Sequence, residues 1–307
     1  MSLFVKTGEY LGTGSGSITT NLSFTPKAVF LWTDAPTSGT STRSRFKTDT
    51  MGANDSGGIG VSTFYTDGNI TFSGDGFSVA GTSTNGMNIS SKQYYWLALG
   101  GPECVTGSYV GNGTNNRNIT GLGIDPDFVL VKRADNTLPY FKTSASGKTT
   151  DTSGTLIDTA FQAGFIKQLI ADGFQVGNFT AVNQDSDTFH YLALQKSGNA
   201  DQFNEGVYTG NGTDDRNITG LGFNPNFVAI KADTALVSRI RSLETTDTSS
   251  SFAAAATASN NIQQFVVDGF EIGTSNDVNQ SSVAYYYFAF QDNEPLPTNT
   301  GNFLAFM

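Results

Sequence analysis

Few residues in this chain have the chemistry of a catalytic or metal site. His190 is the single histidine and Cys104 the single cysteine among 307 residues. A zinc site of the Cys/His type is therefore excluded, and a Ser-His-Asp triad has only His190 as its base. His190 lies in an apolar segment whose counterparts elsewhere in the chain carry Tyr95 and Tyr286. We interpret it as a structural ring, and we predict no catalytic residue.

Oxygen ligands and carboxylates are more frequent, but none is singled out by an apolar setting. Asp185 and Asp187, with Asn183, form one oxygen-rich group that suits calcium. A glycosidase needs only two carboxylates, and glycan hydrolysis stays a minor alternative. The glycine-rich segments 111–113 and 210–212 are not followed by Lys-Ser/Thr, so they indicate hairpin turns and not phosphate loops. We predict neither a cofactor nor a metal.

Two kinds of side chain could bind a partner. Arg117 and Arg216 each lie beside an Asn-Gly turn, where a guanidinium could hold a partner carboxylate or stack at an interface. The favoured alternative is that each arginine holds its own loop. Trp32, Tyr140 and Tyr285 could stack on sugars if they are exposed, although packing in the core is the default for aromatic rings.

The elements that position these residues recur along the chain. Residues 111–123 are repeated at 210–222 with two Asn replaced by Asp. Weaker landmarks extend the repeat to the N-terminus: Tyr10, Tyr109 and Tyr208; Pro26, Pro126 and Pro225; Asp75, Asp172 and Asp268, each before Gly-Phe. A fixed period of this size predicts tandem structural units. We define unit one as residues 1–101, which is divergent, unit two as 105–196 and unit three as 203–294, followed by an extension at 295–307.

Composition and periodicity predict an all-β fold for each unit. Glycine is abundant at 35 residues, only 14% of residues are charged, and apolar residues alternate over 18–24, as in a half-buried strand. The continuous apolar runs 28–32, 128–132 and 227–231 indicate strands covered on both faces. We predict three tandem jelly-roll-like β-sandwiches. Helically spaced apolar residues add short helical turns near 156–161 and 252–258.

Charge and hydropathy limit the partners. The formal net charge is −10, and no basic cluster suits nucleic acid. No apolar run is long enough for a signal peptide or a membrane span, so we expect neither a membrane nor a nucleic-acid partner. The apolar tail with Phe303, Leu304 and Phe306 either adds a strand to its own sheet or docks on a neighbour.

The repeat itself resembles a known module. The series Tyr-x-Gly-Asn-Gly-Thr, Ile-Thr-Gly-Leu-Gly-Phe-x-Pro, Asp-Gly-Phe and Tyr-Phe-Ala-Phe, read in residues 208–290, is similar to a β-rich module of tailed-bacteriophage structural proteins. Unit one has a shorter first loop and Ser-Phe-Thr-Pro at 23–26 in place of Gly-Phe-Asn-Pro. The resemblance implies a virion protein assembled in the host cytoplasm, with other capsid or tail subunits as partners. It implies no active site.

Two functions follow as expectations. The first is a head decoration or cement protein, whose three sandwiches imitate a trimer on a local three-fold of the capsid or bridge neighbouring subunits, with the apolar tail as a clamp. No coiled-coil heptads of the kind a long fibre carries are present in the sequence. The alternative is a carbohydrate-binding adhesin of a tail or head fibre that contacts host surface glycans through loop aromatics.

Overall fold

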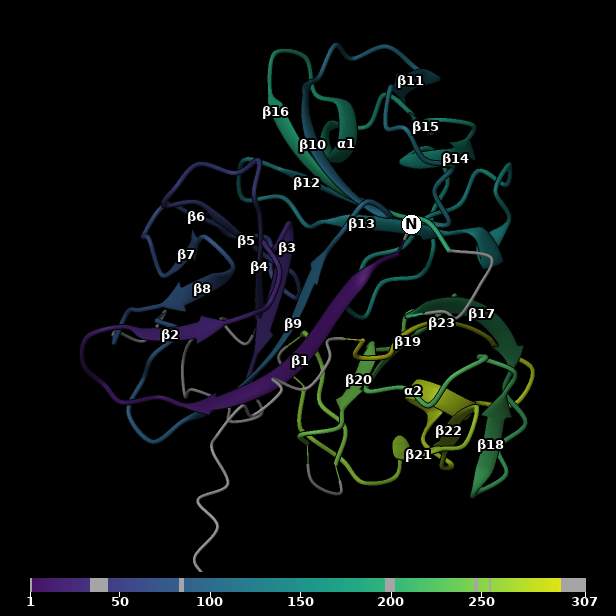
Figure 1. Cartoon of the computed structure of the whole chain (residues 1–307). Helices are drawn as coiled ribbons and strands as arrows, with labels where there is room; N and C mark the ends of the chain where they lie inside the picture. Colours follow the sequence, from purple (N-terminus) through teal and green to yellow (C-terminus); the bar gives the residue numbers. More distant parts are fainter. Residues whose placement is uncertain are drawn as a thin grey trace, which may run out of the picture.

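The chain is all-β, as predicted, and its three units surround a common centre. The computed structural model describes residues 2–33, 44–82, 86–196, 202–245, 248–253 and 255–293. Figure 1 shows three lobes: unit one in purple and blue, unit two in teal, and unit three in green and yellow. Each lobe contains a larger and a smaller antiparallel sheet.

Unit one has nine strands in the described residues. They are β1 Phe4–Leu11, β2 Ile18–Asn21, β3 Ala28–Trp32, β4 Ser44–Thr48, β5 Ser56–Gly58, β6 Phe64–Tyr65, β7 Ile70–Ser73, β8 Gly76–Val79 and β9 Gln93–Gly100. The larger sheet has the order β1-β9-β3-β4-β5-β6, and the smaller sheet the order β2-β8-β7. The first and last strands of the unit therefore pair with each other.

Units two and three repeat this order with seven strands each. Unit two consists of β10 Cys104–Val110, β11 Arg117–Thr120, β12 Phe128–Arg133, β13 Tyr140–Thr143, η1 Ser144–Ser146, β14 Ile166–Ile170, β15 Gly173–Val176, α1 Thr180–Asn183 and β16 Thr188–Leu194. Unit three consists of β17 Phe203–Thr209, β18 Arg216–Thr219, β19 Phe227–Ala232, β20 Arg239–Ser242, β21 Ile262–Val266, β22 Gly269–Ile272, α2 Asn276–Asn279 and β23 Ala284–Phe290. The sheets are β10-β16-β12-β13 with β11-β15-β14, and β17-β23-β19-β20 with β18-β22-β21.

The larger sheet of each unit is covered on both faces, as its continuous apolar strands predict. Along β12, Val129 and Val131 face the smaller sheet of unit two and belong to its own core. Phe128 and Leu130 alternate with them and point to the opposite face. That second face packs against the other two units, so a strand without polar alternation is what the position requires.

A shared central core lies where the three larger sheets meet. It joins buried side chains from all three units into one apolar cluster. Equivalent positions, matched through strand pairing, contribute one residue from each unit: Val5, Cys104 and Phe203; Ala28, Phe128 and Phe227; Leu97, Leu192 and Phe288; Leu99, Leu194 and Phe290. The units are thus three sandwiches around one additional core.

Polar contacts between units close the arrangement into a ring. The first strand of each unit hydrogen-bonds to the turn after the fourth strand of the unit before it. The donor and acceptor side chains are Thr106 with Asp49, Ser144 with Glu205, and Thr7 with Glu244. The last pair joins unit one to unit three, because Thr7 lies on β1 and Glu244 follows β20. The backbone N–H of Val5 also donates to Asn293 Oδ1 at 2.9 Å, which reinforces this closure.

The predicted helical turns at 156–161 and 252–258 are wrong. The described residues of both stretches are irregular, held by isolated bridges such as Ser153 with Gln162. Leu156 and Phe252 insert into the shared central core, and their carbonyl oxygens accept hydrogen bonds from the next unit, Leu156 from Ser238 at 2.7 Å. Long-range packing overrides the helical spacing here.

The three interfaces between units differ in the aromatic ring that a loop of one unit packs against the next unit. Phe64 of unit one stacks on His190 of unit two at 6.1 Å between ring centroids. Phe161 of unit two lies 4.9 Å from Tyr286 of unit three, with the two rings tilted by 35°. The bridge pattern places Thr257 at the equivalent position of unit three, so among the described residues this position of the third interface carries a threonine in place of the ring.

Glycine on each first strand makes room for an aromatic ring on the last. Gly8, Gly107 and Gly206 pair directly with Trp96, Tyr191 and Tyr287. A Cβ added at Gly206 would lie 2.4 Å from the Tyr287 hydroxyl oxygen, and the additions at the other two glycines would lie as close to their rings. The ring thus occupies the space over the glycine in every unit.

Candidate functional site

The three repeat tyrosines occupy the same environment. Tyr109 stacks on Phe189 at 5.1 Å, and its hydroxyl donates to the Val182 carbonyl at 2.5 Å. The equivalent stacked pairs are Tyr10 with Tyr94 at 5.0 Å and Tyr208 with Tyr285 at 5.3 Å. Burial raises the pKa of these tyrosines, so they serve as neutral hydrogen-bond donors in the fold.

Arg117 and Arg216 hold their own loops. The Arg117 guanidinium carbon lies 5.2 Å from the centroid of the Tyr109 ring, and Nη1 donates to the Val110 carbonyl at 2.5 Å. Arg216 lies 5.4 Å from the Tyr208 ring in the same arrangement. These contacts stay within one unit, which is the favoured alternative of the sequence analysis. Binding of a partner by either arginine stays a prediction.

A buried asparagine organises each of these loops, and sequence reasoning missed it. Asn183 at the end of α1 is fully buried; it accepts from the Asn112 N–H at 3.1 Å and donates to the Thr114 carbonyl at 2.8 Å. Asn279 at the end of α2 does the same in unit three. The repeated Val-Asn-Gln at 182–184 and 278–280 was the available clue.

Two of the three residues that could form a calcium site are engaged in other contacts. The Asn183 side chain is used by the loop, and Asp187 forms an ion pair with Arg133. Within the described ranges, no group of three or more His, Cys, Asp or Glu side chains could hold a metal ion.

Trp32 and Tyr285 are buried, so their predicted role as surface rings is wrong. Trp32 has 0% exposure and packs edge-on against Phe227 of unit three at 5.4 Å and against Phe252 at 6.0 Å. It pairs with Tyr95 where the other units pair a lysine with His190 or Tyr286. Trp32 ends an apolar strand whose alternate residues enter the shared central core, which explains its burial.

His190 packs as a structural ring, as interpreted from the sequence, and Cys104 is a buried core residue. His190 lies on β16 at the position of Tyr95 and Tyr286, under Phe64, and burial lowers its pKa. Cys104 is fully buried in the shared central core. Burial raises the pKa of the Cys104 thiol to about 12, so the thiol is protonated and inaccessible at neutral pH.

Buried lysines satisfy loop carbonyls between and within units. Lys132 has 0% exposure, and its Nζ donates to the carbonyls of Ser62, Asp135 and Thr137 at 3.0, 2.5 and 2.6 Å. Burial lowers the pKa of Lys132 from 10.5 to about 7, with Asp135 acting in the opposite direction. Burial likewise lowers the pKa of Lys142 and of Lys231 to about 8.

These shifts give a pH dependence of stability. Between about pH 7 and pH 9.5 the unfolded chain binds more protons than the native state, so the free energy of unfolding rises with pH. Lys132→Met removes the contribution of one proton to this difference in bound protons. The slope of the free energy of unfolding against pH therefore falls by up to about 1.4 kcal/mol per pH unit. Urea denaturation at pH 7, 8 and 9 measures it, with the exposed Lys148→Met as control. An unchanged slope in Lys132→Met would contradict the assignment.

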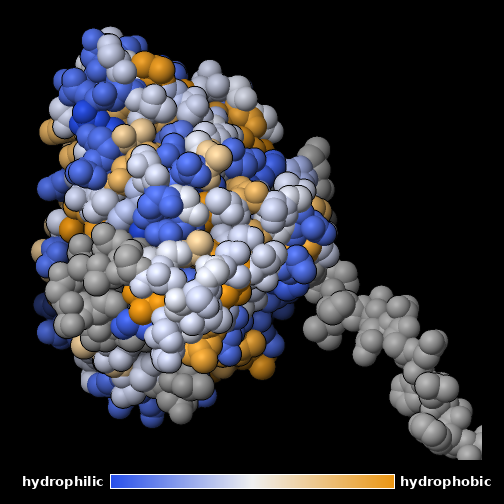
Figure 2. Space-filling view, turned by 90° about the vertical axis from the view of Figure 1, so that its left-hand side faces the viewer, coloured by the Kyte–Doolittle hydropathy of each residue, from blue (hydrophilic) through white to orange (hydrophobic). Residues whose placement is uncertain are grey.

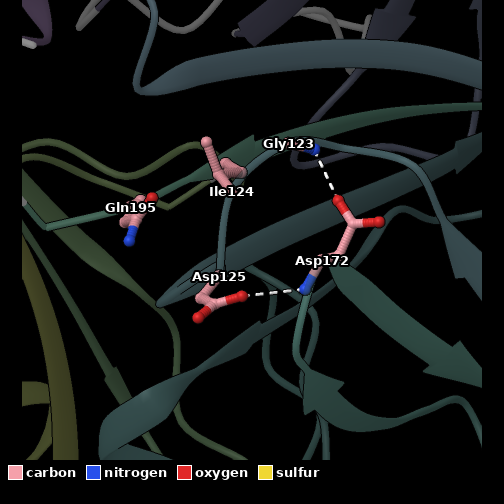
Figure 3. Close-up of a pocket in the computed structure, with 5 residues that line it drawn as sticks. All are labelled: Gly123, Ile124, Asp125, Asp172 and Gln195. Atoms are coloured by element: carbon pink, nitrogen blue, oxygen red, sulfur yellow. Dashed lines mark hydrogen bonds between the residues drawn. The ribbon is translucent and has the colours of Figure 1, made fainter.

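A shallow hollow of about 350 Å³ holds two carboxylates, but both are used by the fold. Gly123, Ile124, Asp125, Asp172 and Gln195 line it (Figure 3). Asp172 accepts from the Gly123 N–H at 2.6 Å, and Asp125 accepts from the Asp172 N–H at 2.8 Å.

The equivalent contacts in unit three indicate that these two carboxylates stabilise a turn. Asp268 accepts from the N–H groups of Gly220 and Gly222 at 3.0 and 2.6 Å, and Asn224 replaces Asp125. Asp172 and Asp268 also have positive φ, 58° and 63°, which this turn requires. The Asp-Gly-Phe landmarks of units two and three are therefore turn signatures, and the hollow offers no acid–base pair.

Tyr140 belongs to a stack of three rings that reaches the surface. Its ring lies 3.8 Å from Phe165 at 9° between planes, and Phe165 lies 4.5 Å from Phe179 at 12°. Phe165 is buried, whereas Phe179 is 48% exposed. We call Tyr140, Phe165 and Phe179 the aromatic stack. Sequence reasoning identified Tyr140 but missed the other two rings.

The other two units have ion pairs where unit two has the aromatic stack. Strand pairing places Arg45 and Arg239 at the position of Tyr140. Arg45 pairs with Asp67 at 2.8 Å, and Arg239 with Asp277 at 2.7 Å. The fold therefore accepts a polar pair here, and the rings of unit two are not required by the sandwich itself.

Exposed apolar side chains are otherwise scattered. Large ones within the described residues are Phe4, Leu11, Val110, Phe179, Val207, Leu243 and Val267. On the face drawn in Figure 2, hydrophobic groups are interspersed with polar ones. Within the described residues, no helix is long and apolar enough to cross a membrane. Phe303, Leu304 and Phe306, predicted to dock on a neighbour, lie outside the described residues.

The comparisons with known proteins match one unit. Residues 196–304 match the model of a family described as a domain of unknown function (DUF7483). This range contains every strand of unit three and no strand of units one and two. No curated protein matches the chain.

Proposed function

We propose that this chain is a structural protein of a tailed-bacteriophage virion, a head decoration protein that binds the capsid at a local three-fold position. The observation that carries the proposal is the closed ring of three equivalent sandwiches around one shared central core. A single chain of this form has the arrangement of a trimer. The resemblance of the repeat to modules of phage structural proteins supports the virion setting.

A three-fold site suits such a ring because three identical capsid subunits present three equivalent surfaces. Equivalent loops of the three units contact these surfaces together, and three weak contacts on one rigid body give strong attachment. The formal charge of −10 favours a basic capsid surface as the partner. Rim charges of this kind accelerate and orient binding.

A carbohydrate-binding adhesin is the second candidate. The exposed part of the aromatic stack is the observation that favours it, since Phe179 presents a ring to solvent beside polar loops. An adhesin belongs on a tail or head fibre, whereas a decoration protein belongs on the capsid shell, so the position in the particle separates the two.

Imaging of purified particles tests the proposal. Cryo-electron microscopy of the phage that encodes the chain is expected to show one three-lobed density at each occupied three-fold position. Heads and tails separated after particle disruption, each assayed for the chain by mass spectrometry, provide the control. Presence in tails alone favours the adhesin, and presence only in free, non-virion material contradicts both candidates.

A further inference from the structure

We propose that the aromatic stack of unit two binds the flat face of a pyranose ring in a glycan. Phe179 is the outermost ring, 48% exposed, with one face on Phe165 at 4.5 Å. Phe165 covers one face of this ring, which leaves the opposite face and the ring edge as the surfaces that supply this exposure. The axial C–H groups of a pyranose carry partial positive charge, and the face of an aromatic ring carries partial negative charge, so the two surfaces attract and exclude water.

The stack holds its outer ring in place before any ligand binds. Three nearly parallel rings, with Phe165 buried between the other two, fix the orientation of Phe179. Gly164 leaves room for it: a Cβ at this position would lie 2.4 Å from Phe179 Cε2. A preorganised ring loses little conformational entropy on binding, which favours affinity for a small ligand.

Polar side chains lie near the rings of the aromatic stack. Two of these groups are already paired within the fold: Tyr140 donates from its hydroxyl to Gln162 at 3.4 Å, and Asp151 accepts from the Gly164 N–H at 2.7 Å and pairs with Lys167 at 3.2 Å. Asn178 and Thr180, on either side of Phe179 in the sequence, are exposed. Asn178 and Thr180 therefore supply an exposed amide and an exposed hydroxyl next to Phe179 in the chain, which suits a ligand with one apolar face and a polar edge.

A protein partner fits this surface less well. A stable protein interface buries on the order of 1,000 Å² or more and has an apolar centre. Here one exposed ring has exposed polar residues at both sequence neighbours, Asn178 and Thr180. The area is small for a protein and sufficient for one sugar ring. Within the part of the chain that the structure describes, unit two alone has the three stacked rings, so we expect one site in each chain. The inference does not depend on the position of the chain in the virion.

Glycan binding by the full chain tests the proposal. The probe is an array of bacterial O-antigen and capsular oligosaccharides that contain hexose and N-acetylhexosamine pyranoses, followed by calorimetric titration of the strongest ligand. Phe179→Ser introduces the residue that unit three has at this position, Ser275, and is expected to weaken binding by at least about tenfold. Phe179→Leu keeps an apolar side chain but removes the flat face, and we expect a similar loss.

The controls separate binding from folding. Val267→Ala changes an exposed apolar residue of unit three, 81% exposed, and is expected to bind as the unchanged chain does. Thermal unfolding of each variant verifies that the fold is retained. Absence of binding to every oligosaccharide of the array overturns the proposal, as does Phe179→Leu binding with unchanged affinity. Neither result affects the capsid proposal, which imaging of particles tests separately.

Discussion

Trp32→Ala is expected to lower the free energy of unfolding by about 3–5 kcal/mol. Trp32 has no exposed surface and packs against Phe227 and Phe252 of unit three. Removal of the indole leaves a cavity at the junction of two units. The surrounding strands belong to hydrogen-bonded sheets of two units and cannot move into that cavity. We therefore expect a loss of stability in the upper range for core truncations.

The same variant tests whether the units unfold together. Because the shared central core contains residues of all three units, we expect a single transition in urea, with circular dichroism and tryptophan fluorescence coinciding. In Trp32→Ala, Trp96 of unit one is the remaining tryptophan and reports on its own sandwich. Leu243→Ala, at a site 62% exposed, serves as control and should change stability by less than about 0.5 kcal/mol. Separate transitions by the two probes would contradict a shared core.

Gly206→Ala is expected to destabilise the chain by about 2–3 kcal/mol. The new Cβ would lie 2.4 Å from the Tyr287 hydroxyl oxygen and 2.6 Å from Cζ of the same ring. Tyr287 is 7% exposed, and its ring packs edge-on against Phe270 at 5.3 Å, so it has little freedom to move away. Equilibrium denaturation measures the loss.

A second substitution distinguishes this clash from a general effect of alanine in a strand. Tyr287→Val removes the ring over Gly206, so Gly206→Ala should cost about 1–2 kcal/mol less in that background. Val207→Ala on the same strand, 49% exposed, is the control. Additive effects of the two substitutions would show that the ring does not restrict position 206.

The strands could be predicted because each one recurs in all three units, so that its sequence pattern can be compared three times. The apolar run 128–132 indicates a strand covered on both faces, and β12 is such a strand. The sequence does not reveal what covers the second face, since Phe128 would look the same under a helix or under another unit. The spacing of Leu156, Ile157, Ala160 and Phe161 suits a helix equally well. Only the shared central core explains why these residues form an extended loop.

The candidate site was less accessible to prediction. Trp32 occupies the position that Lys132 and Lys231 occupy in the other units. Lysine at equivalent positions predicts an exposed site, whereas the fold buries this position. Phe165 lies 25 residues after Tyr140 and Phe179 a further 14 residues on, and no periodicity links them. Their meeting depends on how β13, the start of β14 and the start of α1 are brought together.

The missing ring at Thr257 has an evolutionary consequence. In an assembly of three identical chains, every substitution appears at all three interfaces at once, so a change harmful at one of them is selected against at the others too. One covalent chain removes that constraint. The junction between units three and one contains Trp32, whereas the other two contain Phe64 on His190 and Phe161 on Tyr286. Each lobe can therefore diverge separately, and a lobe can gain a new ligand while its neighbours preserve the scaffold.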